Sequence, residues 1–518
     1  MTDEAPRRRW TRRRKIIIGV VVAILVLCGL PMPWTPSGAL NAIFQGTGGS
    51  TPAHPSAALC DRVLTAKSAP PDGHTDPQGT LRVIGIQYKL DIAHVTTYSA
   101  YRNAMRCLME RYVVPYERPG TPTLVVFPED VGLETIAIGQ RGEAARAQAD
   151  TPARAPLGDA GTAGIGTALL GLNAAYAPQI AAYQVRFGGV DPRKQVLLAA
   201  TDTFVRAFSE TFSDIARDYG VYVVAANNQA PYRQTHNPAE VALFGDPAAG
   251  GNTAFIATKN YVANTTFLWG PSNVHPSAAD GEKNLLFTNY KVPLTSMETS
   301  ILGLDPGPST GPAAVANAAG YEVAGFRLGF ATSLPAFTYG YDFGTQPPAG
   351  DPCANTAKTY AACMNAQGVQ VVVQAEANPG RWAGPGGESD WQPLEWMGST
   401  WRTVADPTVG FRYNITAMMT GSLEDLTFDG QSAITERGAV GTPRNYVGAS
   451  TLQPGDPASM AAYAGPKPQF LALAPWVTPD ASRSALITTG TQLAAGSGVA
   501  QENDYVETSV YADLVPGP

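Results

Sequence analysis

The sequence predicts an α/β protein whose sheets are mostly buried. Short apolar runs rich in β-branched residues recur along the 518-residue chain, and stretches with apolar residues at three- and four-residue spacing lie between some of them. Such runs indicate strands that are covered on both faces. The chain is 44% hydrophobic and 15% charged, with 53 Gly and 43 Pro, so it can bury a large core and is expected to carry long loops. The order of the strands does not follow from these patterns.

The first 34 residues predict a membrane anchor. Residues 1–15 hold seven basic and two acidic side chains, and residues 16–34 carry no charge. A segment of that length spans a bilayer core of about 30 Å. The basic flank places the N-terminus in the cytoplasm and the body outside the cell membrane, as a single-pass protein. A cleaved signal peptide is the alternative, but no A-x-A site follows, which favours an uncleaved signal-anchor.

Composition divides the rest of the chain into two parts. Residues 35–80 are rich in Pro, Gly, Ser, Thr and Ala and are expected to be a linker, and residues 81–515 are expected to be the folded domain. Most of the 43 acidic residues lie in this body, whereas seven of the 36 basic ones lie in the N-terminal tail. A net acidic body repels phosphate backbones, so nucleic acid is excluded as a partner. Assembly into a homo-oligomer stays open.

Four of the five cysteines are expected to form two disulfides in an exported body. Proximity along the chain suggests Cys353 with Cys363 and Cys60 with Cys107, and free buried thiols are the alternative. Cys28 lies in the anchor and is interpreted as an apolar filler.

The elements follow from the local patterns. A helix is expected over 94–111, and a second over 204–219 that ends at Gly220 as a C′ residue. An Ala- and Gly-rich stretch at 140–175 has no clear period and is interpreted as an insertion. Strands are expected at 81–88, 123–130, 221–227, 252–258, 284–292, 326–333, 369–377, 411–418 and 505–514.

Three polar residues stand at or near the ends of apolar strands, where α/β proteins usually place their sites. Glu129 follows LVVF, Lys291 follows NLLFTNY, and Ser333 ends RLGFAT. Together they would supply a general base, a charge stabiliser and a nucleophile. Each also has a structural interpretation: a solvated turn residue, a surface strand residue, and a small cap before Pro335.

The sequences of these segments and their order along the chain resemble the motifs of the carbon–nitrogen hydrolase superfamily, which includes nitrilases, aliphatic amidases and apolipoprotein N-acyltransferases. TLVVFPED matches the strand that ends in Pro-Glu and implies Glu129 as general base. TNYKVPLTSME matches the next element and implies Lys291 as oxyanion stabiliser and Glu298 as second carboxylate. RLGFATSLP aligns with the nucleophile segment and places Ser333 where the family has cysteine. The resemblance covers about 81–515 and implies an αββα sandwich of two sheets with helices outside.

The departures from the family put activity in question. Serine replaces cysteine, and Leu334-Pro335 replaces the usual aromatic and acidic pair. A thiol ionises near pH 8.5, whereas a serine hydroxyl depends on a well-placed base. Two functions are therefore expected: an enzyme that hydrolyses amide- or nitrile-type bonds or transfers acyl groups through Ser333, or a catalytically silent protein that binds or scaffolds at the cell envelope. The substrate of the enzyme would be a small amide-like or acyl compound.

Other motifs carry little weight. GPSTG (307–311) fits a nucleophile elbow by its letters, but it lies in a Pro- and Gly-rich loop instead of a strand-to-helix turn. The five histidines show no spacing for a metal and no CxxC occurs, so no metal is expected. No phosphate-binding GxxxxGK[ST] is present, and no cofactor is expected.

Overall fold

A computed structural model describes residues 51–149, 163–347, 349–379, 392–423, 426–438, 440–446, 458–476, 484–485, 487–488 and 506–517. They belong to one compact unit that begins at Thr51. The expected tail (1–15) and membrane anchor (16–34) lie outside these ranges. None of the described helices is long and apolar enough to span a bilayer.

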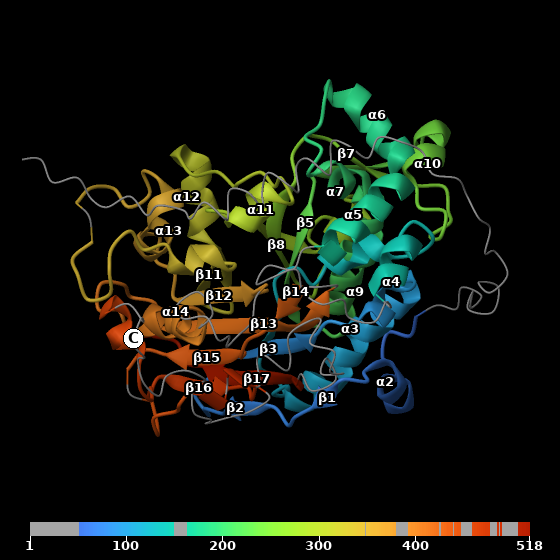
Figure 1. The fold of residues 1–518 in the computed structure, drawn as a ribbon. Helices are drawn as coiled ribbons and strands as arrows, with labels where there is room; N and C mark the ends of the chain where they lie inside the picture. The colour runs from blue at the N-terminus through green and yellow to red at the C-terminus, as the bar shows by residue number, and fades with distance from the viewer. Residues whose placement is uncertain are drawn as a thin grey trace, which may run out of the picture. The chain divides into compact units, whose positions relative to one another are not determined.

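The secondary structure alternates between strands and helices along most of the chain (Figure 1). The strands are β1 (Lys67–Ser68), β2 (Asp72–His74), β3 (Leu81–Lys89), β4 (Thr123–Val126), β5 (Tyr222–Gln229), β6 (Tyr232–Thr235), β7 (Ala254–Ala257), β8 (Ala263–Trp269), β9 (Leu285–Tyr290), β10 (Tyr321–Val323), β11 (Phe326–Phe330), β12 (Val371–Glu376), β13 (Tyr413–Leu423), β14 (Leu426–Phe428), β15 (Ala433–Glu436), β16 (Phe470–Leu473) and β17 (Val506–Leu514).

The α-helices are α2 (Ala57–Val63), α3 (Tyr98–Tyr112), α4 (Glu143–Ala149), α5 (Ala163–Ala175), α6 (Ala177–Phe187), α7 (Gln195–Ala199), α8 (Thr201–Phe204), α9 (Glu210–Asp218), α10 (Pro238–Phe244), α11 (Ser296–Ser300), α12 (Gly311–Ala319), α13 (Thr356–Ala366) and α14 (Pro393–Ala405). A π-helical turn, η4 (Val205–Ser209), joins α8 to α9. The short 3₁₀ helices are η1 (Ile92–Val95), η2 (Val114–Tyr116), η3 (Leu133–Ala137), η5 (Asp280–Glu282), η6 (Leu334–Phe337) and η8 (Ala458–Tyr463).

The main sheet has two halves. In the first, β3, β4 and β5 are parallel, β17 pairs antiparallel with β3, and β8 and β9 continue antiparallel from β5. In the second, β11, β12 and β13 are parallel and are flanked by antiparallel β10 and β15. The halves join at one corner, where Met419 of β13 pairs with Tyr88 and Thr420 with Lys89 of β3.

Alternation along the strands shows how the halves pack. Leu81 and Val83 of β3 lie in the same apolar cluster as Val371 and Val373 of β12, so this cluster fills the space between the two halves. The intervening residues of β3, such as Ile84, lie in a different cluster with residues of α2, α3 and α9. On the other half, side chains of β12 pack with α12 and α13, and a further cluster holds α14.

The layers are therefore helix, sheet, sheet and helix. In Figure 1, α12 and α13 group beside β11, whereas α3, α4, α5 and α9 group beside β3 and β5. The expected αββα sandwich is confirmed for the folded body, because both sheet faces of each half are covered by apolar side chains.

Several expected elements lie where the sequence placed them, and two regions differ. The strands expected at 81–88, 369–377 and 505–514 correspond to β3, β12 and β17, and Gly220 takes the left-handed conformation after α9. The linker expected over 35–80 is wrong for its last part. Residues 57–63 form the helix α2. The short strands β1 and β2 pair with β17, since a polar, Pro-rich stretch can still add strands at the edge of a sheet. The expected insertion contains α4 and α5.

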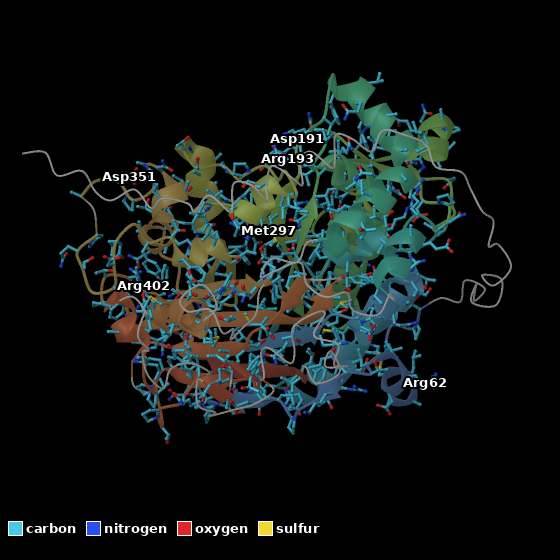
Figure 2. All side chains as sticks on the ribbon, in the orientation of Figure 1. Arg62, Asp191, Arg193, Met297, Asp351 and Arg402 are labelled. Atoms are coloured by element: carbon cyan, nitrogen blue, oxygen red, sulfur yellow. A yellow bond between two sulfur atoms is a disulfide. The ribbon has the colours of Figure 1, made fainter. Side chains whose placement is uncertain are left out.

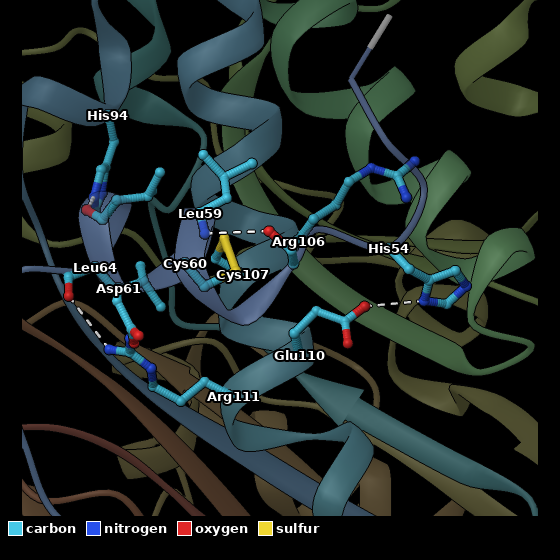
Figure 3. The surroundings of a disulfide bond; sticks show 12 residues. His54, Leu59, Cys60, Asp61, Leu64, His94, Arg106, Cys107, Glu110 and Arg111 are labelled. Carbon is cyan, nitrogen blue, oxygen red and sulfur yellow. Dashed lines mark hydrogen bonds and ion pairs between the residues drawn. A yellow bond between two sulfur atoms is a disulfide. The ribbon is translucent and has the colours of Figure 1, made fainter.

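Both expected disulfides are present. Cys60–Cys107 connects α2 to α3, and Cys353–Cys363 connects the segment before α13 to that helix. Figure 3 shows the first of them beside a pair of arginines on α3. Arg106 donates to the Ala53 carbonyl at 2.6 Å, and Arg111 pairs with Asp61 at 2.8 Å. The segment from residue 51 onward is thus fixed to α3 by covalent and polar contacts.

Candidate active site

Glu129 lies just past β4, where the chain turns away from the sheet. The Phe127 amide still donates to the Val224 carbonyl, so β4–β5 pairing holds the chain almost to the glutamate. Asp130, the next residue, has a positive φ of 58°, which turns the chain sharply. Glu129 is 2% exposed. Its Oε2 accepts a hydrogen bond from the Ala377 amide at 3.1 Å, so the loop after β12 fixes this carboxylate.

Lys291 follows β9 and is held by its main chain on both sides. Its amide donates to the Asn264 carbonyl of β8, and its carbonyl accepts from the Gly307 amide. The side chain is 3% exposed. Its Nζ lies 2.7 Å from Glu129 Oε1 and 2.9 Å from Glu298 Oε1. One ammonium therefore bridges two carboxylates.

Glu298 is fixed at the start of α11, which Figure 2 marks through the neighbouring Met297. Thr295 is the N-cap, and the two residues form a capping box. Glu298 Oε2 accepts from the Thr295 amide at 2.7 Å and from its hydroxyl at 2.9 Å. Because Oε2 is used by the cap, Oε1 is left to face Lys291.

Asn264 is a site residue that sequence analysis missed. Its Nδ2 donates to Glu129 Oε1 at 2.6 Å and to Glu298 Oε1 at 2.9 Å. The amide therefore fixes the same two oxygens that Lys291 holds. Asn264 lies inside the buried strand β8, and a buried asparagine in an apolar strand is the signal that could have pointed to it.

Ser333 follows β11 and has an unusual backbone conformation. Its φ is 57° and its ψ is −120°, a combination that costs a non-glycine residue about 1–3 kcal/mol. The Ser333 amide donates to the Ala375 carbonyl at 3.1 Å. Ala377, two residues further along, holds Glu129. Ser333 and Glu129 are therefore attached to the same end of β12, and Ser333 is 2% exposed.

Glu376, the last residue of β12, is a further acidic group that sequence analysis missed. It is fully buried, and its Oε1 accepts from Gln374 Nε2 at 2.7 Å. Burial raises its pKa well above the usual value, the charge of Glu129 adds to this, and the Gln374 amide and Ser333 hydroxyl oppose it. The sequence analysis predicted a strand over residues 369–377 but assigned no role in the site to Glu376 within it.

Burial and mutual contact shift the pKa values of the central groups in different directions. Burial raises the pKa of Glu129, and Lys291 only partly offsets this. Burial acts in the same direction on Glu298, but Lys291 and the Thr295 amide outweigh it and leave that pKa lowered. The pKa of Lys291 is raised because its two carboxylates outweigh burial. The pKa shifts of Lys291 and Glu298 therefore favour their charged forms, whereas the pKa of Glu129 is shifted in favour of its neutral form.

The structure thus brings together Glu129, Lys291 and Glu298 by direct contact, and Ser333 through the end of β12. Such a group can supply a base, a cationic oxyanion stabiliser and a hydroxyl nucleophile. Within the described part of the chain, no three His, Cys, Asp or Glu side chains form a metal-binding group. GPSTG at 307–311 lies in a loop that leads into α12 with no strand before it.

Comparison with known proteins adds the following. No protein-family profile and no curated protein matches the chain. Among solved structures, the chain is similar to a mutant of the Nesterenkonia AN1 amidase from the nitrilase superfamily, with a TM-score of 0.32, 16% identity, and coverage of 69% of this chain and 84% of that one.

A second similar structure is a mutant of the same amidase from Nesterenkonia sp. AN1, with the acetamide moiety of fluoroacetamide added covalently at its active site cysteine. Its TM-score is 0.33 at 14% identity, with coverage of 80% of this chain and 95% of that one. A third, in complex with butyramide, has a TM-score of 0.32 at 15% identity, covering 70% and 85%. Because these identities and TM-scores are low, the interpretation of the site depends on its own geometry.

Proposed function

We propose that the protein is a carbon–nitrogen hydrolase-like enzyme that attacks amide-type or acyl substrates through Ser333. The observation that carries this proposal is the buried Lys291 ammonium between Glu129 and Glu298, together with Ser333, whose strained backbone is held at the same end of β12 as Glu129. Burying three charged groups is costly unless they have a function or a compensating network. Strained residues also concentrate at functional sites.

The chemistry assigns one step to each side chain. The Ser333 oxygen attacks the carbonyl carbon while Glu129 takes the hydroxyl proton. The carbonyl electron pair moves to oxygen, and Lys291 stabilises the resulting oxyanion. When the carbon–nitrogen bond breaks, Glu129 returns the proton to the leaving amine, and a water or an acceptor amine then releases the acyl group from Ser333. Glu298 keeps Lys291 and Asn264 in position.

We further propose that this site lies outside the cell membrane, with the chain anchored by residues 16–34. The basic tail before an uncharged apolar segment supports the orientation. Two disulfides support an oxidising compartment, because cytosolic thiols are kept reduced. Amide-bearing or acyl-bearing components of the cell envelope would then be within reach.

The test is intact-mass analysis of the full chain in detergent after exposure to a panel of activated esters and amides. We expect an acyl adduct that maps to Ser333 and is lost in Glu129→Gln. Ser333→Ala is the control for labelling elsewhere. An adduct of equal yield in Glu129→Gln would refute Glu129 as the base, and one of equal yield in Ser333→Ala would refute Ser333 as the nucleophile.

A second candidate is a binding or scaffold protein that keeps the fold without turnover. The closed state of the site favours it, because Glu129, Lys291 and Ser333 are each no more than 3% exposed. Ser333→Cys separates the two functions. An adduct on Ser333→Cys with none on the native chain would indicate an intact site whose chemistry is inactive, and would favour the scaffold.

A further inference from the structure

A serine nucleophile needs more help than a cysteine in the same place. A free thiol ionises near pH 8.5, so much of its activation is intrinsic. A hydroxyl is a weak nucleophile until a base removes its proton. Glu129 supplies that base in the proposed function, but the hydrogen bonds and ion pairs of Glu129, Lys291 and Glu298 described above do not include the Ser333 oxygen.

Glu376 is the polar side chain placed to do so. It lies one residue after Ala375, whose carbonyl accepts from the Ser333 amide, and the Ser333 hydroxyl is among the polar groups that lower the pKa of Glu376. Its Oε1 is committed as an acceptor of the Gln374 amide at 2.7 Å. Gln374 is itself fixed by Asn414, which donates to its oxygen at 2.8 Å. Among the described residues, none forms a hydrogen bond with Glu376 Oε2, which is buried.

Charge balance indicates which state Glu376 is in. Lys291 is in contact with Glu129 and Glu298, at 2.7 and 2.9 Å, and so already faces two carboxylates. A third ionised carboxylate in the same buried space would lack a cation of its own. Burial raises the pKa of Glu376, and the charge of Glu129 acts in the same direction. Since Oε1 accepts from Gln374, the proton belongs on Oε2.

We propose that Glu376 is a further catalytic residue: a neutral carboxylic acid that donates from Oε2 to the Ser333 oxygen. This inference rests on the proposed function and deepens it. The donated hydrogen bond leaves the serine proton directed to Glu129 and stabilises negative charge on the serine oxygen as that proton leaves. Glu376 keeps its own proton throughout, so Ser333 loses one proton, Glu129 gains it, and no other group changes protonation.

The first test is a double-mutant cycle on the full chain in detergent, with the rate of acylation by 4-nitrophenyl acetate as readout. Glu376→Leu removes the donor at similar volume, and Glu376→Gln replaces it with an amide donor. We expect Glu376→Leu to slow acylation of Ser333 about 10- to 100-fold, and Glu376→Gln to stay within about threefold of the native rate. In a Ser333→Cys background, Glu376→Leu should cost less than about threefold, because a thiolate needs no such donor.

Two results would overturn the proposal. Equal losses from Glu376→Leu in the Ser333 and Ser333→Cys chains would indicate a purely structural role. A loss in Glu376→Gln as large as in Glu376→Leu would indicate that Glu376 works as a carboxylate. Glu507→Gln is the matched control, because it makes the same substitution at another fully buried glutamate, on β17.

A second measurement does not depend on turnover or on Glu376→Leu folding. Infrared difference spectra of native protein against Glu376→Gln at pH 7 should show the carbonyl band of one protonated carboxylic acid. That band should shift in Ser333→Ala, because its hydrogen-bond acceptor is gone. The proposal would be overturned if the band is absent, or if its frequency is the same in Ser333→Ala as in the native protein. If the band behaves as expected but the native chain is never acylated, the proposed function fails and the Glu376–Ser333 contact stands.

Discussion

Replacing Glu507 by glutamine tests the electrostatics of the fold away from the candidate site. Glu507 lies on β17 and is fully buried. Burial raises its pKa from 4.5 to about 8, and nearby Arg111 only partly opposes this. In the unfolded chain the carboxyl returns to its ordinary value. Between those two pH values the folded protein therefore binds more protons than the unfolded one.

The sign and size of the effect follow from proton linkage. Stabilisation by the neutral acid is complete below pH 4.5 and is lost as pH rises towards 8, because burying the carboxylate is unfavourable. The loss is about 1.4 kcal/mol per pH unit, or about 5 kcal/mol over the whole window. Glu507→Gln cannot ionise. We expect the free energy of unfolding of this variant to fall less steeply with pH, by about 1.4 kcal/mol per unit.

The assay is urea unfolding of the full chain at pH 5.5, 6.5 and 7.5. Comparing slopes removes any constant cost of the buried amide, which can reach about 1–3 kcal/mol. Glu134→Gln should act in the same direction, because burial raises the pKa of Glu134 to about 8 as well. Glu322→Gln, at an exposed position on β10, is the control. Equal slopes for the native protein and Glu507→Gln would refute the reasoning.

Three further predictions concern single features. Lys291→Met leaves two buried carboxylates without their cation and should lower the free energy of unfolding by about 3–5 kcal/mol in thermal or urea denaturation at pH 7. The control is Lys283→Met, in a surface ion pair with Asp280, which should lower the free energy of unfolding by less than about 1 kcal/mol. Equal losses in the two variants would contradict the conclusion that Lys291 compensates buried charge. Ser333→Gly should be about 1 kcal/mol more stable than Ser333→Ala because φ is positive there, and the reverse order would contradict strain. Replacing both Cys60 and Cys107 by serine should cost about 4 kcal/mol for a loop of 47 residues, and an unchanged urea midpoint would contradict this.

The sequence predicted the central part of the site because strand ends carry a local signal. Glu129 and Lys291 each stand where an apolar run meets a polar residue, and both lie at such points in the structure. Glu298 came only from the resemblance, and its capping box with Thr295 explains why it is held there. Ser333 was also named from the end of an apolar run, the resemblance placed it at the nucleophile position, and its positive φ could not be read from the sequence.

Asn264 and Glu376 were missed for a physical reason. Each lies within or at the end of a buried strand, and its role depends on which strands are neighbours. Neighbouring strands here are far apart in the chain: Glu129 contacts Ala377 and Asn264, which no local pattern relates. The strand order, which decides these contacts, was the part of the fold that the patterns left open. The linker prediction for residues 35–80 was wrong in part for the same reason: β1 and β2 pair with β17, which lies near the C-terminus and is far from them in sequence.

The shared attachment of Ser333 and Glu129 to the end of β12 has a dynamic consequence. The Ala375 carbonyl holds one group and the Ala377 amide holds the other, so a displacement of this strand end carries both in the same direction. The separation between Ser333, the proposed nucleophile, and Glu129, the proposed base, is then less sensitive to displacements of this strand end than it would be if each were held by a different strand. A displacement of the end of β12 that exposes the candidate site would therefore move the proposed nucleophile and the proposed base together.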